Sequence, residues 1–263
     1  MSERSHPAID ISLISINHRA QLAQLLPSIE RCLNRDDIRV LLVLNRTVDD
    51  TRSWTRSAHP TVSMTENPRV AGYGENHNVN LRRAQGKYFA IMNTDMIVSP
   101  DVFVTLHRFM EENPQVGVVV PKVLNEDGSI QGLNKRYPSV FDLFLRLACP
   151  SGLSRFFRRR LDRYEMRDRG YETQYDVPVV SGSFMFCRTE VLRSLGGFDE
   201  EFFLYFEDFD LCRRIQQTHR TTYCPATWVI HFWERSAHKD WRFAWRFTRS
   251  AMRYFRKWGW KLT

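Results

Sequence analysis

The sequence lacks long apolar runs, paired cysteines and an apolar leader. No stretch of its 263 residues approaches the roughly 20 apolar residues that a membrane-spanning helix needs. The polar start MSERSHPAID has no signal core, and the five widely spaced cysteines form no CxxC pair. An odd number of unpaired cysteines is typical of free thiols in a reducing compartment. We therefore expect a cytoplasmic protein, free or peripheral on the inner face of the plasma membrane.

The sequence also lacks internal repeats, a low-complexity linker and any recognised nucleic-acid-binding motif. Its net charge of +8 favours anionic partners, which include nucleic acid, phospholipid headgroups and phosphorylated substrates. Charge alone does not choose among these partners, but without a motif we expect no nucleic acid.

The first half of the chain alternates between strand-like and helix-like spacing of apolar residues. Strand patterns occupy residues 9–17, 38–45, 61–67, 87–93 and 116–124. Helical patterns occupy residues 19–33, 74–85 and 99–113. The run IRVLLVLN (38–45) is continuously apolar, as in a strand buried on both faces. This order predicts an α/β fold with a mostly parallel Rossmann-like sheet flanked by helices.

The second half of the chain is less regular. Residues 125–176 lack clean alternation and contain the basic run RFFRRR, so we interpret them as an insertion or helical excursion. Strand character returns at 177–188 and 221–231, with a short helix at 189–197 that ends in glycine. A basic, aromatic helix is predicted at the C-terminus.

The stretch IMNTDMIV (91–98) places Asp95 directly after a buried strand. Open parallel sheets hold their ligands at this end of their strands. A carboxylate there can bind Mg²⁺ or Mn²⁺, which take oxygen ligands and also bind phosphates. The alternative is an aspartate in an ordinary β-turn.

The segment FFLYFEDFD (202–210) crowds acids behind a block of aromatics. On a helix, Glu207 and Asp210 share one face while Asp208 points elsewhere. The aromatics would exclude water and raise a carboxylate's pKa toward the working range of a general base. A helix N-terminus, where the dipole favours acids, explains the same residues without catalysis.

Two further features are weaker. His231 ends the strand TWVIH, so it can open onto the same crevice as Asp95, although a lone histidine is more often structural. The loop NPRVAGYGENHN (67–78) has glycines and asparagines that permit tight turns and close approach to a ligand, but it is not a P-loop.

Together these segments resemble the family-2 glycosyltransferases, most closely the bacterial branch that includes rhamnosyltransferases. The resemblance rests on Asn93-Thr94-Asp95, VSGSFMFCR, LGGFDEEFFLYFEDFDLCRR, WVIH and GYGENHN, and it extends from Ile11 to about Ser236. It implies a GT-A fold and an inverting, metal-dependent transfer of a sugar, rhamnose by branch resemblance. The implied donor is a nucleotide sugar, and the implied acceptor is a glycan or polyprenyl-diphosphate-linked molecule of a bacterial surface polysaccharide.

The resemblance implies domain bounds for the chain and functional roles for individual residues. Residues 8–236 would form the GT-A domain, with a nucleotide-sugar half (8–124), an acceptor half (125–236) and a separate C-terminal helix (237–263). Asp208 would be the base with Glu207 as its neighbour, and Asp95 with His231 would hold Mg²⁺ or Mn²⁺. The positions implied to bind the donor and its nucleotide are Ser15, Asn17, Asn45, Arg46, Gly72, Tyr73, Asn76, Asn78, Asn93, Thr94 and Asp95. The acceptor side would contain Ser181, Gly182 and Ser183.

Two departures from the family pattern bear on the donor. Leu44 stands where the family usually has an aspartate that contacts the nucleotide, so the base preference is open and Arg46 is a candidate to compensate. Asn93 replaces the first acid of the Asp-x-Asp motif, which leaves Asp95 as the main metal carboxylate.

The C-terminal segment WRFAWRFTRSAMRYFRKWGWKLT has arginines at steps of four and three, which places them on one helical stripe. Basic amphipathic helices with Trp and Phe can lie in a membrane interface, so an anionic membrane surface is a further candidate partner. The alternative is a helix that packs its apolar side on the domain and leaves its arginines in water.

Two other functions are weighed against the same sequence features. A nonenzymatic GT-A domain could bind nucleotide or glycan, or scaffold an assembly complex; Leu44 favours it, whereas Asp95, Asp208 and His231 argue against it. A sugar nucleotidyltransferase should have a glycine-rich, basic nucleotide loop near its N-terminus, and SLISINHRAQ has none.

Overall fold

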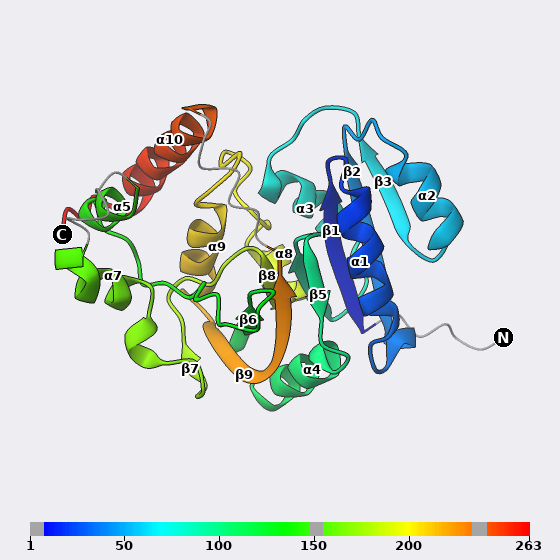
Figure 1. The fold of residues 1–263 in the computed structure, drawn as a ribbon, viewed down its shortest axis with the longest axis horizontal. Coiled ribbons are helices and arrows are strands. Elements are labelled where there is room, and N and C mark those ends of the chain that lie inside the picture. Colours follow the sequence, from blue (N-terminus) through cyan, green and yellow to red (C-terminus); the bar gives the residue numbers. More distant parts are fainter. Residues whose placement is uncertain (1–7, 148–154, 233–240) are drawn as a thin grey trace.

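The computed structural model describes residues 8–147, 155–232 and 241–263. In these ranges one nine-stranded sheet runs through the molecule in the order β3-β2-β1-β4-β8-β6-β9-β5, with β7 paired to β9. The early strands and their helices lie at one end, and α5, α7 and α10 lie at the other (Figure 1). The predicted α/β class is therefore confirmed.

Four parallel strands form the N-terminal half of the sheet: β1 (Ile9–Ser15), β2 (Ile38–Asn45), β3 (Ser63–Asn67) and β4 (Tyr88–Met92). Both faces of β2 are covered, which explains the unbroken apolar run of this strand. The helices of this half are α1 (Arg19–Glu30), α2 (Thr51–Ala58), α3 (Tyr73–Arg83) and α4 (Val102–Glu112). Of these helices, the sequence analysis had missed only α2.

The second half of the sheet contains both parallel and antiparallel strand pairs. Its strands are β5 (Met96–Val98), β6 (Val116–Leu124), β7 (Tyr175–Asp176), β8 (Phe184–Arg188) and β9 (Arg220–His231). Strand β8 runs antiparallel between β4 and β6 and so joins the two halves. The predicted strand at 177–188 is therefore wrong for its first seven residues. There Pro178 has no N–H, and Val179 pairs with Lys135 in an isolated bridge.

The described residues of the segment 125–176 are largely helical or irregular, in line with the predicted helical excursion. It contains α5 (Val140–Leu147), α7 (Arg158–Tyr164) and the 3₁₀ turns η2 (Arg155–Phe157) and η3 (Arg167–Arg169), while η1 (Arg35–Asp37) precedes β2. Helices α8 (Thr189–Ser194) and α9 (Glu207–Ile215) follow β8. Glu207, Asp208 and Asp210 lie in the first turn of α9.

The C-terminal helix α10 (Trp241–Trp258) packs on the domain. Its buried Ala251, Tyr254 and Phe255 join Phe202 and Phe206 in one apolar cluster. Gly259 follows the helix with a φ of 91°, and the Lys261 carbonyl accepts a hydrogen bond from the N–H of Val140, at the start of α5, at 2.8 Å. The described part of α10 thus packs its apolar side on the domain, which is the second of the two alternatives considered for this helix. Residues 237–240 lie outside the described residues.

The described cysteines, Cys32, Cys187, Cys212 and Cys224, are buried free thiols, as expected from their spacing. Cys149 lies outside the described residues. In the parts of the chain that the structure describes, no helix combines the length and apolar character that crossing a bilayer requires.

Candidate active site

Asp95 and His231 meet where β5 pairs with β9. Met96 is opposite His231 in the antiparallel register, which brings the two side chains to the same edge. His231 Nε2 lies 3.4 Å from Asp95 Oδ1 and 3.4 Å from Asn93 Nδ2. Burial alone would raise the pKa of Asp95, but the hydrogen bond and charge of His231 hold it below its ordinary value. The two residues predicted to share a metal site are thus neighbours.

Gln131 orients this histidine, and the sequence analysis had missed it. Gln131 Oε1 accepts a hydrogen bond from His231 Nδ1 at 2.7 Å, and its Nε2 donates to the His231 carbonyl at 3.1 Å. Because Gln131 holds the proton on Nδ1, a cation bound beside Asp95 would take the place of the proton on Nε2. Two ligands about 2.1 Å from an octahedral ion lie about 3 Å apart, close to the Asp95–His231 separation.

These groups fit a divalent cation only in part. Among the described residues, no group of three His, Cys, Asp or Glu side chains could hold a metal ion. A carboxylate and an imidazole leave positions for water and phosphate oxygens, which is how Mg²⁺ is usually held. The donor set suits an ion that binds together with a diphosphate.

The acidic motif opens α9 through a strained turn. Tyr205 and Phe206 both take left-handed conformations, with φ of 69° and 67°. Such conformations are costly for bulky residues and persist where the surrounding structure enforces them, often at functional sites. The turn places Glu207 and Asp208 in the first turn of α9.

Asp208 is held by backbone donors. Its Oδ2 accepts from the Gly182 N–H at 3.0 Å, and its Oδ1 accepts from the Phe209 N–H at 2.9 Å. Burial raises the pKa of Asp208, while the Lys135 charge and these two N–H groups oppose the rise. Burial outweighs these opposing groups, so the pKa of Asp208 is raised, although both of its oxygens have hydrogen-bond donors.

Glu207 differs from its neighbour. It is 6% exposed, and no described group bonds its Oε2. Burial, and then the charge of Asp208, raise the pKa of Glu207 well above its ordinary value. Glu207 therefore favours the protonated form more strongly than Asp208, whose two oxygens both accept backbone hydrogen bonds.

Tyr73 connects the two acidic sites. Its hydroxyl donates toward the Gly182 carbonyl at 2.7 Å and Asn93 Oδ1 at 3.1 Å. Burial and the charges of Glu207, Asp208 and Asp95 raise its pKa well above the ordinary value. One buried phenol therefore lies within the electrostatic reach of all three carboxylates.

The segment Ser181-Gly182-Ser183 completes this connection. The Ser183 carbonyl accepts from the Asn93 N–H at 2.9 Å, two residues before Asp95. Gly182 binds Asp208, and a Cβ at Gly182 would lie 3.4 Å from the Asp208 Cβ. Ser183 Oγ is buried without a partner among the described groups.

Gly72 fixes the glycine-rich loop against the acidic motif. A Cβ there would lie 2.8 Å from the Phe203 carbonyl oxygen, closer than side chains tolerate. The Tyr73 N–H donates to that same carbonyl at 2.9 Å. The two segments, predicted to lie on donor and acceptor sides, are therefore in direct backbone contact.

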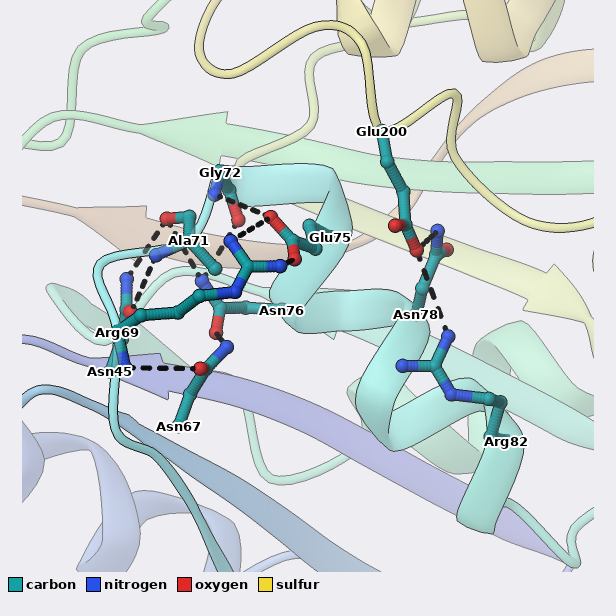
Figure 2. A network of polar contacts seen from close by, with 10 residues as sticks. All are labelled: Asn45, Asn67, Arg69, Ala71, Gly72, Glu75, Asn76, Asn78, Arg82 and Glu200. Atoms are coloured by element: carbon teal, nitrogen blue, oxygen red, sulfur yellow. Dashed lines mark hydrogen bonds and ion pairs between the residues drawn. The ribbon is translucent and has the colours of Figure 1, made fainter.

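Three predicted donor-binding asparagines are occupied by protein partners (Figure 2). Asn45 exchanges two hydrogen bonds with the backbone of Ala71, at 3.1 and 3.0 Å. Asn76 donates to the carbonyls of Ala71 and Gly72. Asn78 is bonded to Phe198 on the far side of α3. These amides shape the loop, and their direct contact with a donor stays a prediction.

The ends of β1 and β2 are tied together. Asn17 Oδ1 accepts from the Val48 N–H at 2.8 Å, and Ser15 Oγ accepts from the His18 N–H at 3.1 Å. Thr94 Oγ1 lies 2.8 Å from His18 Nδ1, which extends the contact toward Asp95. The ends of these strands and the metal-site residues therefore share one edge of the sheet.

Arg46 and Leu44 have opposite environments. Arg46 is exposed in a left-handed conformation with φ of 51°, just past β2. Leu44 is 2% exposed within the core, so its side chain faces away from any nucleotide.

Two of the aromatics before the acids, Phe202 and Phe206, pack against α10. Asp210 is fully buried and pairs with Arg214 at 2.8 Å, and it also accepts a hydrogen bond from Trp258 Nε1 at 2.8 Å. This part of the motif therefore anchors the C-terminal helix.

Comparisons with known proteins agree with this site. A sequence model of the family described as Glycosyltransferase like family 2 matches residues 7–253. The match covers most of the chain, so the chain belongs to this family and consists largely of a glycosyltransferase domain.

Two relatives are rhamnosyltransferases. Rhamnosyltransferase WbbL of Escherichia coli (strain K12) is 24% identical over 239 residues, which cover 88% of this chain and 84% of WbbL. N-acetylglucosaminyl-diphospho-decaprenol L-rhamnosyltransferase of Mycobacterium tuberculosis is 26% identical over 216 residues, 77% of this chain and 69% of that protein. The branch indicated by the sequence motifs is confirmed.

Among solved structures, the mannosyltransferase PcManGT from Pyrobaculum calidifontis superposes with a TM-score of 0.64 at 20% identity. That structure contains GDP-Man and Mn²⁺. The superposition covers 97% of this chain, and the chain spans only 64% of PcManGT. This likeness confirms the expected GT-A fold.

Proposed function

We propose that the protein is an inverting, metal-dependent glycosyltransferase that moves a sugar from a nucleotide sugar to an acceptor hydroxyl. One observation carries the proposal: Tyr73 and the segment Ser181–Ser183 join Asp208 to the Asp95–His231 pair in one site. A displacement at the anomeric carbon needs a base on the acceptor side and a cation at the departing diphosphate. The two acidic sites meet these two needs.

Asp208 is the proposed base. Its two backbone hydrogen bonds and the nearby Lys135 favour the anion, while burial keeps its basicity above that of a surface aspartate. Glu207, held neutral beside it, adds no second negative charge that would compete for the acceptor proton. In this arrangement Asp208 takes the proton of the acceptor hydroxyl as the new bond forms.

Asp95 and His231 would hold Mg²⁺ or Mn²⁺. When bound, such an ion neutralises the charge of the departing diphosphate. Gln131 keeps the histidine in the required tautomer. Mn²⁺ in the PcManGT complex supports this choice of ion class.

The nucleotide would lie across the ends of β1, β2 and β3. Each strand is followed by an exposed apolar residue: Ile16 (44% exposed), Val48 (80%) and Val70 (46%). Apolar side chains at a strand-end crevice offer contact area for a base and ribose, and Arg46 offers a charge for phosphate. In this proposal residues 8–124 bind the donor and residues 125–236 bind the acceptor.

The proposed acceptor is lipid-linked and reached at the cytoplasmic face of the plasma membrane. The name of the Mycobacterium tuberculosis relative specifies a diphospho-decaprenol acceptor, and both relatives transfer rhamnose. Exposed apolar side chains gather on the α5–α7–α10 end: Phe144 (52% exposed), Phe156 (85%), Trp245 (60%), Trp260 (56%) and Leu262 (67%). Arginines on α7 and α10 flank these side chains, which is the composition of an anionic-membrane surface.

Calorimetric titration with nucleoside diphosphates and nucleotide sugars tests the proposal. With Mn²⁺ present, we expect binding of one base class, and we expect Asp95→Ala to lose it. Asp36→Ala, an exposed aspartate before β2, serves as the matched control and should bind like the wild type. If EDTA leaves binding unchanged, the metal role is wrong; tight binding without any transfer would favour the nonenzymatic domain.

A further inference from the structure

Lys135 is a partly buried lysine beside the proposed base. Its backbone and that of Val179 donate to each other's carbonyls at 2.9 Å in an isolated antiparallel bridge. Three residues beyond Val179, the Gly182 N–H binds Asp208. The Lys135 ammonium lies 5.6 Å from the centroid of the Phe209 ring, and Phe209 directly follows Asp208. The lysine is thereby fixed on the acceptor side of the site.

A second cationic side chain, Arg146, lies near Lys135. The N–H of Arg136, next to Lys135, donates to the Tyr164 carbonyl at 2.8 Å, and Arg146 on α5 reaches the following residue, Glu165. These contacts place the charge of Arg146 near Lys135, where it lowers the pKa of Lys135. The nearest acid of Arg146 is Glu165, whose Oε1 lies 4.0 Å from Nη1, and Glu165 is bound more closely by Arg167 at 3.0 Å. The described carboxylates therefore neutralise the charges of Lys135 and Arg146 only weakly.

The charged side chains near Lys135 in the described ranges come from α5, α9 and the residue after α7. Arg146 comes from α5, Glu165 directly follows α7, and Asp208 belongs to α9. Within the described ranges, no carboxylate lies within ion-pair distance of the Lys135 ammonium. Two neighbouring cations repel each other unless an anion lies between them, so this arrangement favours an anionic ligand.

We propose that Lys135 and Arg146 form an anion subsite that binds a phosphate group of the acceptor and so presents the acceptor hydroxyl to Asp208. The inference rests on the proposed function for the role of Asp208, and it specifies the acceptor as a phosphate-linked sugar rather than a neutral glycan. Arginine and lysine are the usual phosphate ligands of proteins, through bidentate hydrogen bonds and a compact charge respectively.

Binding of farnesyl diphosphate in EDTA tests the subsite separately from the metal-dependent donor site. Wild-type protein should bind farnesyl diphosphate at least about tenfold more tightly than farnesol, because each charge-assisted hydrogen bond contributes about tenfold or more. Lys135→Met should lose about tenfold in affinity. Lys122→Met, which removes a lysine on β6 paired with Glu172, is the matched control and should bind normally.

The pH dependence separates a binding role from a structural one. Burial and the charge of Arg146 lower the pKa of Lys135 to about 8. The ammonium is therefore lost as the pH rises through about 8, and wild-type binding should weaken over that interval. Lys135→Arg should bind at pH 7 and retain its affinity at about pH 9.5, because guanidinium stays charged. This comparison holds even if Lys135→Met fails to fold.

Inorganic pyrophosphate serves as the third probe. Affinity equal to that of farnesyl diphosphate supports a subsite that reads phosphate alone, and weaker affinity supports one that also contacts the carrier. Equal binding of farnesyl diphosphate and farnesol overturns the proposal, as does loss in Lys135→Met without recovery in Lys135→Arg. Absence of Mn²⁺-dependent donor binding in wild type would contradict the proposed function while leaving this subsite intact.

Discussion

Glu207→Gln is expected to stabilise the protein increasingly as the pH rises. Glu207 is buried, its Oε2 has no partner among the described groups, and its pKa is raised by burial and by Asp208. The folded protein therefore holds a neutral carboxylic acid at this position. A glutamine side chain reproduces that group in shape and charge.

The size of the effect follows from proton linkage. Below the pKa of an unfolded glutamate, about 4.3, both states carry the proton and the substitution changes little. At higher pH the unfolded wild type releases the proton that the folded state keeps. The free energy of unfolding of the wild type then falls by about 1.4 kcal/mol per pH unit, until the pH reaches the raised pKa of Glu207. The variant has no such proton, so its advantage grows with the same slope.

Urea unfolding followed by tryptophan fluorescence measures this difference. At about pH 4.5, 5.5 and 6.5 the gap between variant and wild type should widen with each step, by about 1.1 kcal/mol over the first step and by about 1.3 kcal/mol over the second. Glu190→Gln, an exposed glutamate at the start of α8, is the control and should differ from wild type by less than about 0.5 kcal/mol throughout. A gap that stays constant with pH would refute a neutral Glu207.

Three further predictions follow from individual contacts. Gly72→Ala places a Cβ 2.8 Å from the Phe203 carbonyl oxygen, so urea unfolding should show a loss of about 1–3 kcal/mol; unchanged stability would contradict the close packing. Gln131→Ala frees His231 to rotate, and the Mn²⁺ concentration for half-maximal donor binding should rise about 10–100-fold. Phe156→Ser should weaken flotation with anionic phospholipid vesicles, since Phe156 is 85% exposed; equal flotation would count against the membrane surface.

The parallel half of the fold was predictable because its strands are buried on both faces. Continuous apolar runs such as 38–45 have no other ready structural explanation, and the structure reproduces the bounds of β2. The short β5 was missed because it has three residues, too few for a period to show. The segment 177–183 has strand-like composition, but Pro178 and the bridge to Lys135 remove it from the ladder.

Residues of the candidate site were predictable where one short motif indicates both their place in the fold and their chemical role. Asp95 follows a buried strand and Asp208 begins a helix, as the sequence indicated. Gln131 and Lys135 were not predicted, because they lie in an irregular excursion and reach the site only through long-range contacts. The buried asparagines also show that a polar loop motif does not distinguish ligand contacts from structural hydrogen bonds.

The measurement that tests the central claim most directly is sugar transfer by Asp208→Asn, compared with its donor affinity. The amide keeps the shape of the side chain but cannot accept the acceptor proton. With the nucleotide sugar selected by the binding screen, Mn²⁺ and a lipid-linked acceptor, kcat should fall about 10²–10⁴-fold while the donor Kd stays within about twofold of wild type. Transfer at the wild-type rate would contradict the role of Asp208 as the base.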